Sequence, residues 1–355
     1  MSRPTQARIN LSALDRNLDV VRRHAPHAKI MAVVKANGYG HGLMRVMQVL
    51  KEADGLAVLA LDEAIALRET GYRQPILLLE GFFGADELPR IAEHHLSAVV
   101  HCREQVEMLM QTWLPAKIDV FLKMNSGMNR LGFRPESFRD ALSELKSCRS
   151  VGDIVLMTHF ANADVSVGIA SQFALFSSAS QGLAHARCLA NSAAVLRYPD
   201  AHAEWVRPGI MLYGSSPFAD KTAEELGLHP VMTLSSRIIA IQHLRAGDPV
   251  GYGGTFVAER DMRVGVVACG YADGYPRHAP TGTPILVEGK HTRTLGRISM
   301  DMMSVDLTDI SGAQLGSNVT LWGDGLPVDD VARAAGTISY ELLCALAPRV
   351  PVFEC

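Results

Sequence analysis

The first two thirds of the chain alternate short, β-branched apolar runs with amphipathic stretches, which limits the folds that it can adopt. Eight runs are strand candidates: 30–35, 56–60, 76–79, 98–101, 118–124, 154–160, 188–190 and 204–206. Helical patterns fall between them, for example at 62–69, 85–94, 103–113 and 135–146. Strands regularly followed by helices indicate a parallel sheet. We therefore predict an α/β fold with a closed (β/α)₈ barrel of the TIM type, and a doubly wound open sheet is the alternative.

An additional helix precedes the first of these strands. Ser12, with Asp15 three residues on, is the expected N-cap, and the helix should end before Pro26.

The pattern changes after about residue 228. Short alternating runs at 235–242, 264–269, 283–287, 302–307 and 318–322 are separated by Gly, Pro and Asp turns, which is typical of a mainly β domain. A length of 355 residues suits roughly two domains. We expect a barrel domain over 1–228 and a C-terminal β domain over 229–355, with the boundary near His229-Pro230.

Charge and composition exclude several classes of partner. The chain has 34 Lys and Arg against 37 Asp and Glu, a net charge of −3, which argues against nucleic acid or an anionic membrane. No apolar stretch approaches the ~18 residues of a membrane span, and the N-terminus does not resemble a signal peptide. The six cysteines form no CxxC pair and lack metal-ligand spacing, so we expect reduced thiols, no metal and a cytoplasmic protein.

Lys35 stands where the first apolar run passes into the glycine-rich stretch VVKANGYGHG. In a barrel of this type, the C-terminal ends of the strands carry the catalytic groups. A lysine that leaves an apolar strand is partly desolvated, which lowers its pKa and makes its amine a nucleophile for an aldehyde. A lone lysine at such a position more often extends to the surface, so other residues must support this interpretation.

Four more strand ends finish in polar or ionisable residues. They supply Lys123 with Arg130 downstream, His159, Asn191 with Ser192, and Arg207 followed by Gly209 and Ile210. Each has an ordinary alternative, since His159 could be a packed core histidine and Ser192 a helix N-cap. Five strand ends that converge on one barrel mouth nevertheless indicate a shared site.

Several longer motifs occur in order along the whole chain. They are AVVKANGYGHG (32–42), VGYGGTF (250–256), GYADGYPR (270–277), GRISMDMMSVD (296–306) and ISYE (338–341). With them, the sequence strongly resembles the alanine racemases, fold-type III enzymes that use pyridoxal 5′-phosphate (PLP). The resemblance implies interconversion of L- and D-alanine by a homodimer with shared active sites. It also implies that the product D-alanine serves peptidoglycan synthesis or that D-alanine is degraded.

The resemblance also implies roles for residues of the barrel. Lys35 matches the lysine that binds PLP covalently, and Arg207 matches the arginine that faces the pyridine nitrogen, with His159 expected to hydrogen-bond Arg207. The residues that match the phosphate-binding set are Tyr39, Ser192, Gly209, Ile210 and Tyr340.

Racemisation needs two acid/base groups, one on each face of the substrate Cα. The resemblance gives Lys35 for the D-face and Tyr252, from the other subunit, for the L-face. Arg130 matches the residue that bonds the substrate carboxylate, and Lys123 matches a lysine that is often modified to N6-carboxylysine.

Three further matches come from the second domain. Met300 and Asp301 match a partner-subunit loop at the substrate carboxylate, and Tyr271 matches a gate residue. Asn125-Ser126 departs from the acidic residue and Thr of many relatives, which leaves the ionic surroundings of Lys123 and Arg130 open.

Three alternatives to an alanine-specific enzyme remain. A racemase of broader specificity is the nearest, and a decarboxylase of basic amino acids is more distant because its motifs differ and its catalytic cysteine has no counterpart here. A PLP carrier protein is the third, but such proteins lack the second domain that 229–355 would form.

Overall fold

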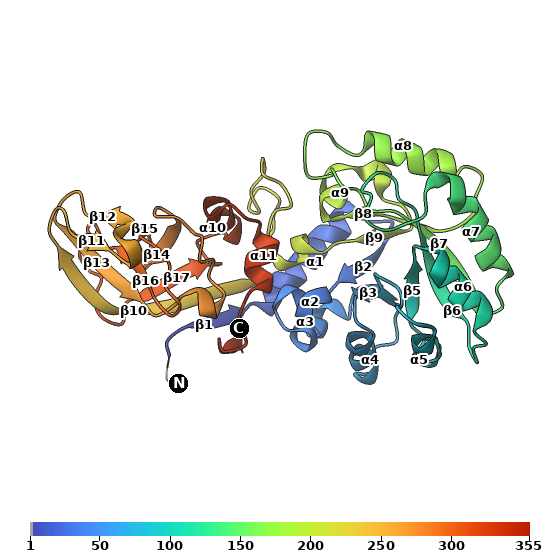
Figure 1. Cartoon of the computed structure of the whole chain (residues 1–355), viewed down its shortest axis with the longest axis horizontal. Helices are drawn as coiled ribbons and strands as arrows, with labels where there is room; N and C mark the ends of the chain where they lie inside the picture. Colours follow the sequence, from blue (N-terminus) through green and yellow to red (C-terminus); the bar gives the residue numbers. More distant parts are fainter. Residues whose placement is uncertain (1–2) are drawn as a thin grey trace.

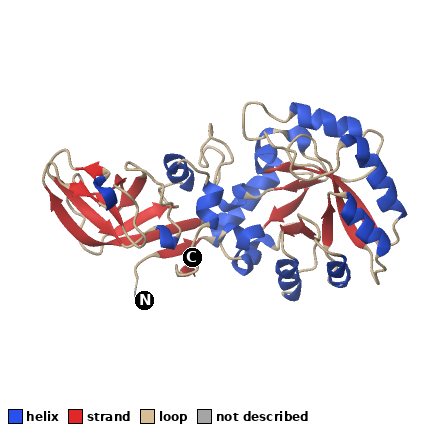
Figure 2. Cartoon of the chain, in the orientation of Figure 1, coloured by secondary structure: helices blue, strands red, loops and turns tan. Residues whose placement is uncertain are grey.

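The computed structural model describes residues 3–355 and has two lobes (Figure 1). A ring of strands surrounded by helices forms one lobe, and strands predominate in the other (Figure 2). Within the described residues, no helix combines the length and the apolar character that a membrane crossing requires.

Eight parallel strands close the first lobe into a barrel, which confirms the predicted fold and excludes the open sheet. The strands are β2 (Lys29–Val33), β3 (Gly55–Val58), β4 (Ile76–Leu78), β5 (Ser97–Val100), β6 (Ile118–Lys123), β7 (Val151–Met157), β8 (Arg187–Asn191) and β9 (Trp205–Arg207). Strands β3, β4 and β5 are buried at every position, as expected for parallel strands covered on both faces. Pairing of β2 with β9 completes the ring.

Helices fill the connections around the barrel. They are α1 (Leu11–His24), α2 (Lys35–Tyr39), α3 (Leu43–Leu50), α4 (Leu61–Glu69), α5 (Leu88–Glu93), α6 (Arg103–Gln111), α7 (Pro135–Ser147), α8 (Ala170–Ala179) and α9 (Ser192–Arg197), with 3₁₀ turns η1 (Ala85–Glu87), η2 (Pro199–Ala201) and η3 (Ile210–Tyr213). Helix α1 ends before Pro26 as predicted, but Ser12 is not its cap. Asn10 is the N-cap, because its side-chain oxygen accepts the N–H of Ala13 at 2.9 Å.

The second lobe is mainly β, as predicted. Its strands are β1 (Gln6–Ile9), β10 (Met232–Leu244), β11 (Pro249–Val250), β12 (Phe256–Val257), β13 (Met262–Val267), β14 (Pro284–Val287), β15 (Lys290–Leu295), β16 (Met303–Asp306), β17 (Asn318–Trp322) and β18 (Val352–Glu354). The large sheet runs β13-β16-β15-β14-β17-β10-β1-β18, and a further pairing of β10 with β13 closes six of these strands on themselves. The β lobe also contains the 3₁₀ turns η4 (Tyr252–Gly254) and η5 (Tyr271–Asp273) and the helices α10 (Val328–Ala335) and α11 (Ser339–Cys344).

Strand β1 lies in this second sheet although it precedes the barrel in the chain. It pairs with β10 in antiparallel and with β18 in parallel orientation. The chain therefore passes between the two lobes twice, once between β1 and α1 and once between the barrel and β10.

The C-terminal helix α11 packs against the barrel mouth. Gly40, just after α2, lies so close to the carbonyl of Leu343 in α11 that any Cβ at position 40 would collide with it. One cluster of buried apolar side chains continues through both lobes. This packing brings Tyr340 of α11 next to the residues that follow β2.

Candidate active site

Lys35 follows β2 directly and begins a left-handed turn. The φ angles of the next five residues, 36–40, are all positive, between 51° and 81°, so α2 is not a right-handed helix. For non-glycine residues such as Ala36 and Asn37 this conformation costs about 1–2 kcal/mol each, and it persists only where the surroundings enforce it. The side chain of Asn37 helps, since its Oδ1 accepts the N–H of Leu43 at 2.8 Å.

A buried histidine and two tyrosines lock this turn. The Nδ1 atom of His41 lies 3.0 and 2.9 Å from the carbonyl oxygens of Gly38 and Tyr39. Complete burial lowers the pKa of His41 to about 4, so the imidazole is neutral and Nδ1 donates its hydrogen. The Tyr213 ring stacks on Tyr39 at 4.6 Å between centroids and lies 4.7 Å from the ring of His41. Its hydroxyl donates to the carbonyl of Val33 in β2 at 3.0 Å.

The five residues that match a phosphate-binding set come together beside this turn. Ser192 Oγ accepts the N–H of Gly209 at 2.8 Å. A Cβ on Gly209 would lie 2.6 Å from the Tyr39 hydroxyl, so only glycine permits this approach. The ring of Tyr340 lies 6.1 Å from that of Tyr39, and Ile210 follows Gly209 directly.

Ser192 is not the N-cap of α9. The cap is Asn191, whose side chain accepts the N–H of Ala194 at 3.0 Å. The serine hydroxyl is therefore left to orient the loop that contains Gly209.

Several donors in this group have no acceptor among residues 3–355. They are the hydroxyls of Tyr39 and Tyr340 and the N–H of Ile210. Burial raises the pKa of both tyrosines, so their hydroxyls remain protonated. These unpartnered donors lie next to the N-terminus of the short helix α9. They suit a bound phosphate, which accepts several hydrogen bonds.

Arg207, at the end of β9, is buried and held from behind. Its Nη1 donates to the carbonyl and the sulfur of Cys188 at 2.6 and 3.0 Å. Its Nη2 donates to the carbonyls of Thr158 and Leu189 at 2.7 and 3.2 Å. The expected hydrogen bond from Arg207 to His159 is not formed in the described chain, because Cys188 and the main-chain carbonyls of Thr158 and Leu189 already accept from both Nη atoms. Only the Nε–H remains available to a ligand.

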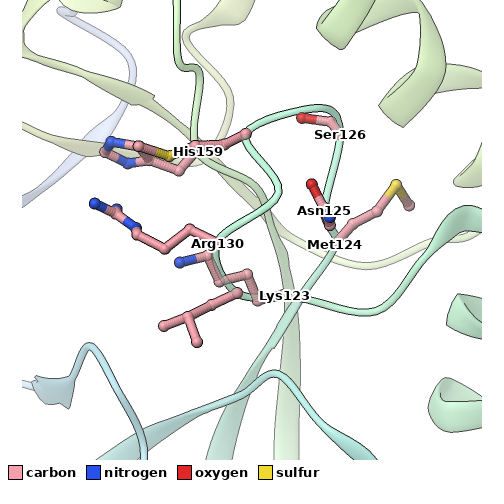
Figure 3. Close-up of a pocket in the computed structure, with 8 residues that line it drawn as sticks. Lys123, Met124, Asn125, Ser126, Arg130 and His159 are labelled. Carbon is pink, nitrogen blue, oxygen red and sulfur yellow. The ribbon is translucent and has the colours of Figure 1, made fainter.

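A small pocket next to Arg207 gathers positive charge. Lys123, Arg130 and His159 extend side by side into it (Figure 3). Its other lining residues are Met124, Asn125, Ser126, Met128 and Leu131. Burial, followed by the charges of Arg207, Arg130 and Lys35, lowers the pKa of Lys123 to about 8. Burial, followed by the charges of Arg207, Lys123 and the other two cations, lowers the pKa of His159 far below 6.5, so the imidazole is neutral.

Apart from Tyr340, the predicted residues of the β lobe do not join this group within one chain. Tyr252 lies in η4 between β11 and β12, at the end of the β lobe that is remote from the barrel in Figure 1, and 73% of its surface is exposed. Met300 and Tyr271 are also accessible. The carboxylate of Asp301 bonds Arg3 and Arg349.

Residue-by-residue reading of the sequence missed three residues that shape the site: His41, Tyr213 and Cys188. His41 lies inside the motif VVKANGYGHG, so its position was visible, but a role through two carbonyl oxygens depends on the left-handed turn. Tyr213 and Cys188 act across the barrel and carry no local signal.

Models of two domain families, "Alanine racemase, N-terminal domain" and "Alanine racemase, C-terminal domain", match residues 9–217 and 231–353. The chain belongs to the alanine racemase family. Alanine racemases from Nitrosospira multiformis and Nitrosomonas europaea are 62% and 60% identical to it, and the alignments cover at least 98% of each chain. It is accordingly an amino-acid racemase, as the resemblance of the sequence motifs predicted.

Solved structures agree with this assignment. The crystal structure of the biosynthetic alanine racemase from Pseudomonas aeruginosa has a TM-score of 0.97 at 46% identity, with 99% of both chains covered. The alanine racemase from Acinetobacter baumannii has a TM-score of 0.94 at 41% identity, with 99% of this chain and 100% of the other covered.

Proposed function

We propose that the protein interconverts L- and D-alanine with PLP as cofactor, in a homodimer whose sites combine Lys35 of one chain with Tyr252 of the partner subunit. The main support is the juxtaposition at the barrel mouth. Lys35 begins a locked, strained turn whose Tyr39 contributes to the phosphate-binding group, and Arg207 and Lys123 lie close enough for their charges to act on the same groups.

The residues fit the cofactor that the family uses. Tyr39, Tyr340 and the N–H of Ile210 are free to bind its phosphate, with Ser192 and Gly209 shaping the loop, and the Nε–H of Arg207 is free to face the pyridine nitrogen. Bound PLP supplies a carbonyl carbon for the Lys35 amine and a conjugated ring that accepts charge from the substrate Cα. Because Arg207 is always charged, it disfavours protonation of a nitrogen beside it, which limits charge delocalisation and side reactions such as transamination.

Two groups then move the proton. Lys35 takes it from, or returns it to, the D-face of Cα, and Tyr252 of the partner subunit acts on the L-face. One base on one face would return the proton to the side it came from, so inversion needs both.

Positive charge next to this site suits a carboxylate substrate. Arg130 is exposed in the single chain and lines the pocket with Lys123, so it is placed to bond the alanine carboxylate. Addition of CO₂ to the Lys123 amine would replace a repelling cation by an anion that pairs with Arg130. Met300, on the loop that also contains Asp301, and Tyr271 as a gate would reach this pocket from the partner subunit.

The shape of one chain supports the two-chain arrangement. Strands β11 and β12, which flank Tyr252, lie at the end of the β lobe away from the barrel, and Tyr252 is largely exposed, so one chain does not bring it to its own barrel mouth. A second copy of the chain would therefore supply Tyr252 to the site that contains Lys35.

The decisive experiment follows D-alanine formation and Cα deuterium uptake in ²H₂O by purified protein with PLP. We expect the wild type to form D-alanine from L-alanine and Lys35→Ala to form none. Tyr252→Phe should still bind PLP but lose exchange mainly from L-alanine.

Two matched variants serve as controls. Lys290→Ala removes an exposed lysine of β15, and Tyr198→Phe removes a hydroxyl without a hydrogen-bond partner in the described structure, so both should retain full activity. Absence of D-alanine from the wild type would contradict the proposed function, and equal loss of exchange from both enantiomers in Tyr252→Phe would contradict the assigned faces.

A further inference from the structure

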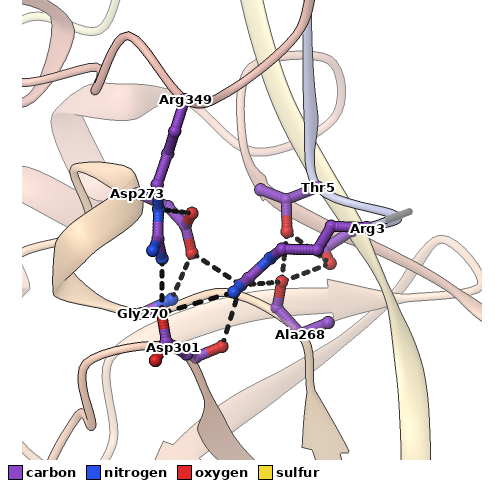
Figure 4. A network of polar contacts seen from close by, with 8 residues as sticks. Arg3, Thr5, Ala268, Gly270, Asp273, Asp301 and Arg349 are labelled. Atoms are coloured by element: carbon purple, nitrogen blue, oxygen red, sulfur yellow. Dashed lines mark hydrogen bonds and ion pairs between the residues drawn. The ribbon is translucent and has the colours of Figure 1, made fainter. Parts of the chain in front are cut away.

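A closed ring of ion pairs joins two loops of the β lobe to segments from both ends of the described chain (Figure 4). Arg3 and Arg349 alternate in it with Asp273 and Asp301, and each arginine bonds both carboxylates. The four nitrogen–oxygen distances lie between 2.6 and 3.3 Å. Arg3 precedes β1, and Arg349 lies between α11 and β18.

Asp273 is the buried member of the ring, with 2% of its side chain exposed. Its Oδ2 accepts from Arg3 and from the N–H of Gly270 at 3.0 Å each, and its Oδ1 accepts from Arg349 at 2.7 Å. A buried carboxylate is tolerated only with such partners, so each arginine is needed to hold the segment in place.

Asp301 is the member of the ring that lies in the second loop, residues 299–302. Its Oδ1 accepts from Arg349 at 2.6 Å and from Arg3 at 3.3 Å. Arg3 also donates to the main-chain carbonyl of Asp301 at 3.1 Å. The carboxylate that the resemblance places at the substrate is thus engaged with two arginines of its own chain.

The two loops are bonded to each other as well. The N–H groups of Tyr271 and Ala272 donate to the carbonyls of Ser299 and Met300 at 3.1 and 2.9 Å. A side chain at Gly270 would collide with the carbonyl oxygens of Ser299 and Met300. Segments 270–273 and 299–302 therefore form one unit, from which Tyr271 and Met300 present accessible side chains, 36% and 53% exposed.

We infer that the ring of Arg3, Asp273, Arg349 and Asp301 is a positioning device that sets where Met300 and Tyr271 meet the alanine substrate in the partner subunit's pocket. The inference rests on the proposed function. Asp301 then acts through the arginines, by holding the Met300 loop. Loosening the ring should weaken alanine binding while Lys35 and Tyr252 stay in place.

Three variants test this in the full-length holoenzyme: Arg3→Gln, Arg349→Gln and Asp301→Asn. We expect KM for both enantiomers to rise about tenfold while kcat stays within about twofold, since substrate binding is lost and proton transfer is not. Amide hydrogen exchange in 270–273 and 299–302 should become about tenfold faster, with or without substrate. Arg349→Lys should give an intermediate KM, because one ammonium cannot reproduce the two directed bonds of a guanidinium.

Arg260→Gln is the control, since it removes an exposed ion pair with Asp309 in the same lobe and should change neither KM nor exchange. Unchanged KM in the three ring variants, whatever their melting temperature, would overturn the inference and leave the proposed function intact. If an arginine variant folds poorly, the KM and the amide exchange of Asp301→Asn test the inference alone, because this substitution removes only a half-exposed charge. A wild type without racemase activity would instead contradict the proposed function.

Discussion

At the scale of single residues, Lys123 has the most unusual environment of the site. Its amine is buried at the end of β6 and is surrounded by the cations Arg207, Arg130 and Lys35, and these causes lower its pKa to about 8. A neutral amine is the form that adds CO₂, with loss of a proton, to give a carbamate. The modification therefore relieves the repulsion that an ammonium group would experience here.

We predict that carbamylation of Lys123 depends on pH in a definite direction. At constant dissolved CO₂, it should rise as pH increases from 6.5 to 8.5, because the neutral fraction of the amine reaches roughly one half near its pKa. The ¹³C resonance of protein equilibrated with ¹³CO₂ measures it. Lys123→Ala should lose the resonance and the exposed-site control Lys117→Ala should keep it, whereas an equal signal in both variants would show that another amine reacts.

At the scale of elements, the left-handed turn after β2 depends on His41, whose imidazole stays neutral in the fold. Between pH 6.5 and about 4 the unfolded chain protonates this histidine and the folded chain does not. The unfolded state then binds more protons, so the free energy of unfolding falls as pH falls through this range. The stability that comes from holding His41 neutral is fully present above pH 6.5.

Substitution of His41 should remove that pH dependence. His41→Asn retains a donor near the position of Nδ1 but cannot titrate. We expect the difference in unfolding free energy between wild type and variant to shrink by about 2 kcal/mol from pH 7.5 to pH 5. Urea unfolding at one fixed protein concentration measures it. The other histidines are common to both proteins and cancel, so a constant difference would mean that His41 is not held neutral.

The elements also show what the sequence could predict. The eight barrel strands were predictable because each contains a short apolar run that is largely buried. The turn at 36–40 was not, since nothing local makes Ala36 or Tyr39 adopt positive φ, and the packing of Tyr213 and His41 imposes it. Strand β15 was missed because four of its six residues are polar and partly or fully exposed.

Pairing between segments that are far apart in the chain could not be predicted from the sequence either. Strand β1 is short, and its place in the second sheet depends on β10, more than two hundred residues away. For the candidate site, the strand ends indicated most of the barrel residues. Only the motif resemblance indicated Tyr39 and Tyr252, and the exposed turn of Tyr252 has no local mark of catalysis.

At the scale of the whole molecule, the two lobes hold the two proposed bases apart within one chain. If each site takes Lys35 from one subunit and Tyr252 from the other, a mixed dimer of Lys35→Ala and Tyr252→Phe chains has one site with both defects and one with neither. If both residues came from the same chain, each site of the mixed dimer would carry one defect.

The two arrangements therefore predict opposite results when the inactive variants are combined. After subunit exchange at equal concentrations, half of the dimers are mixed and one of their two sites is intact, so activity should recover to about one quarter of the wild-type value. Mixing without exchange, monitored by mass spectrometry of differently tagged chains, is the control and should recover nothing. Mixed dimers without activity would place both bases in one chain, which requires a closure of the two lobes that the shared core between them opposes.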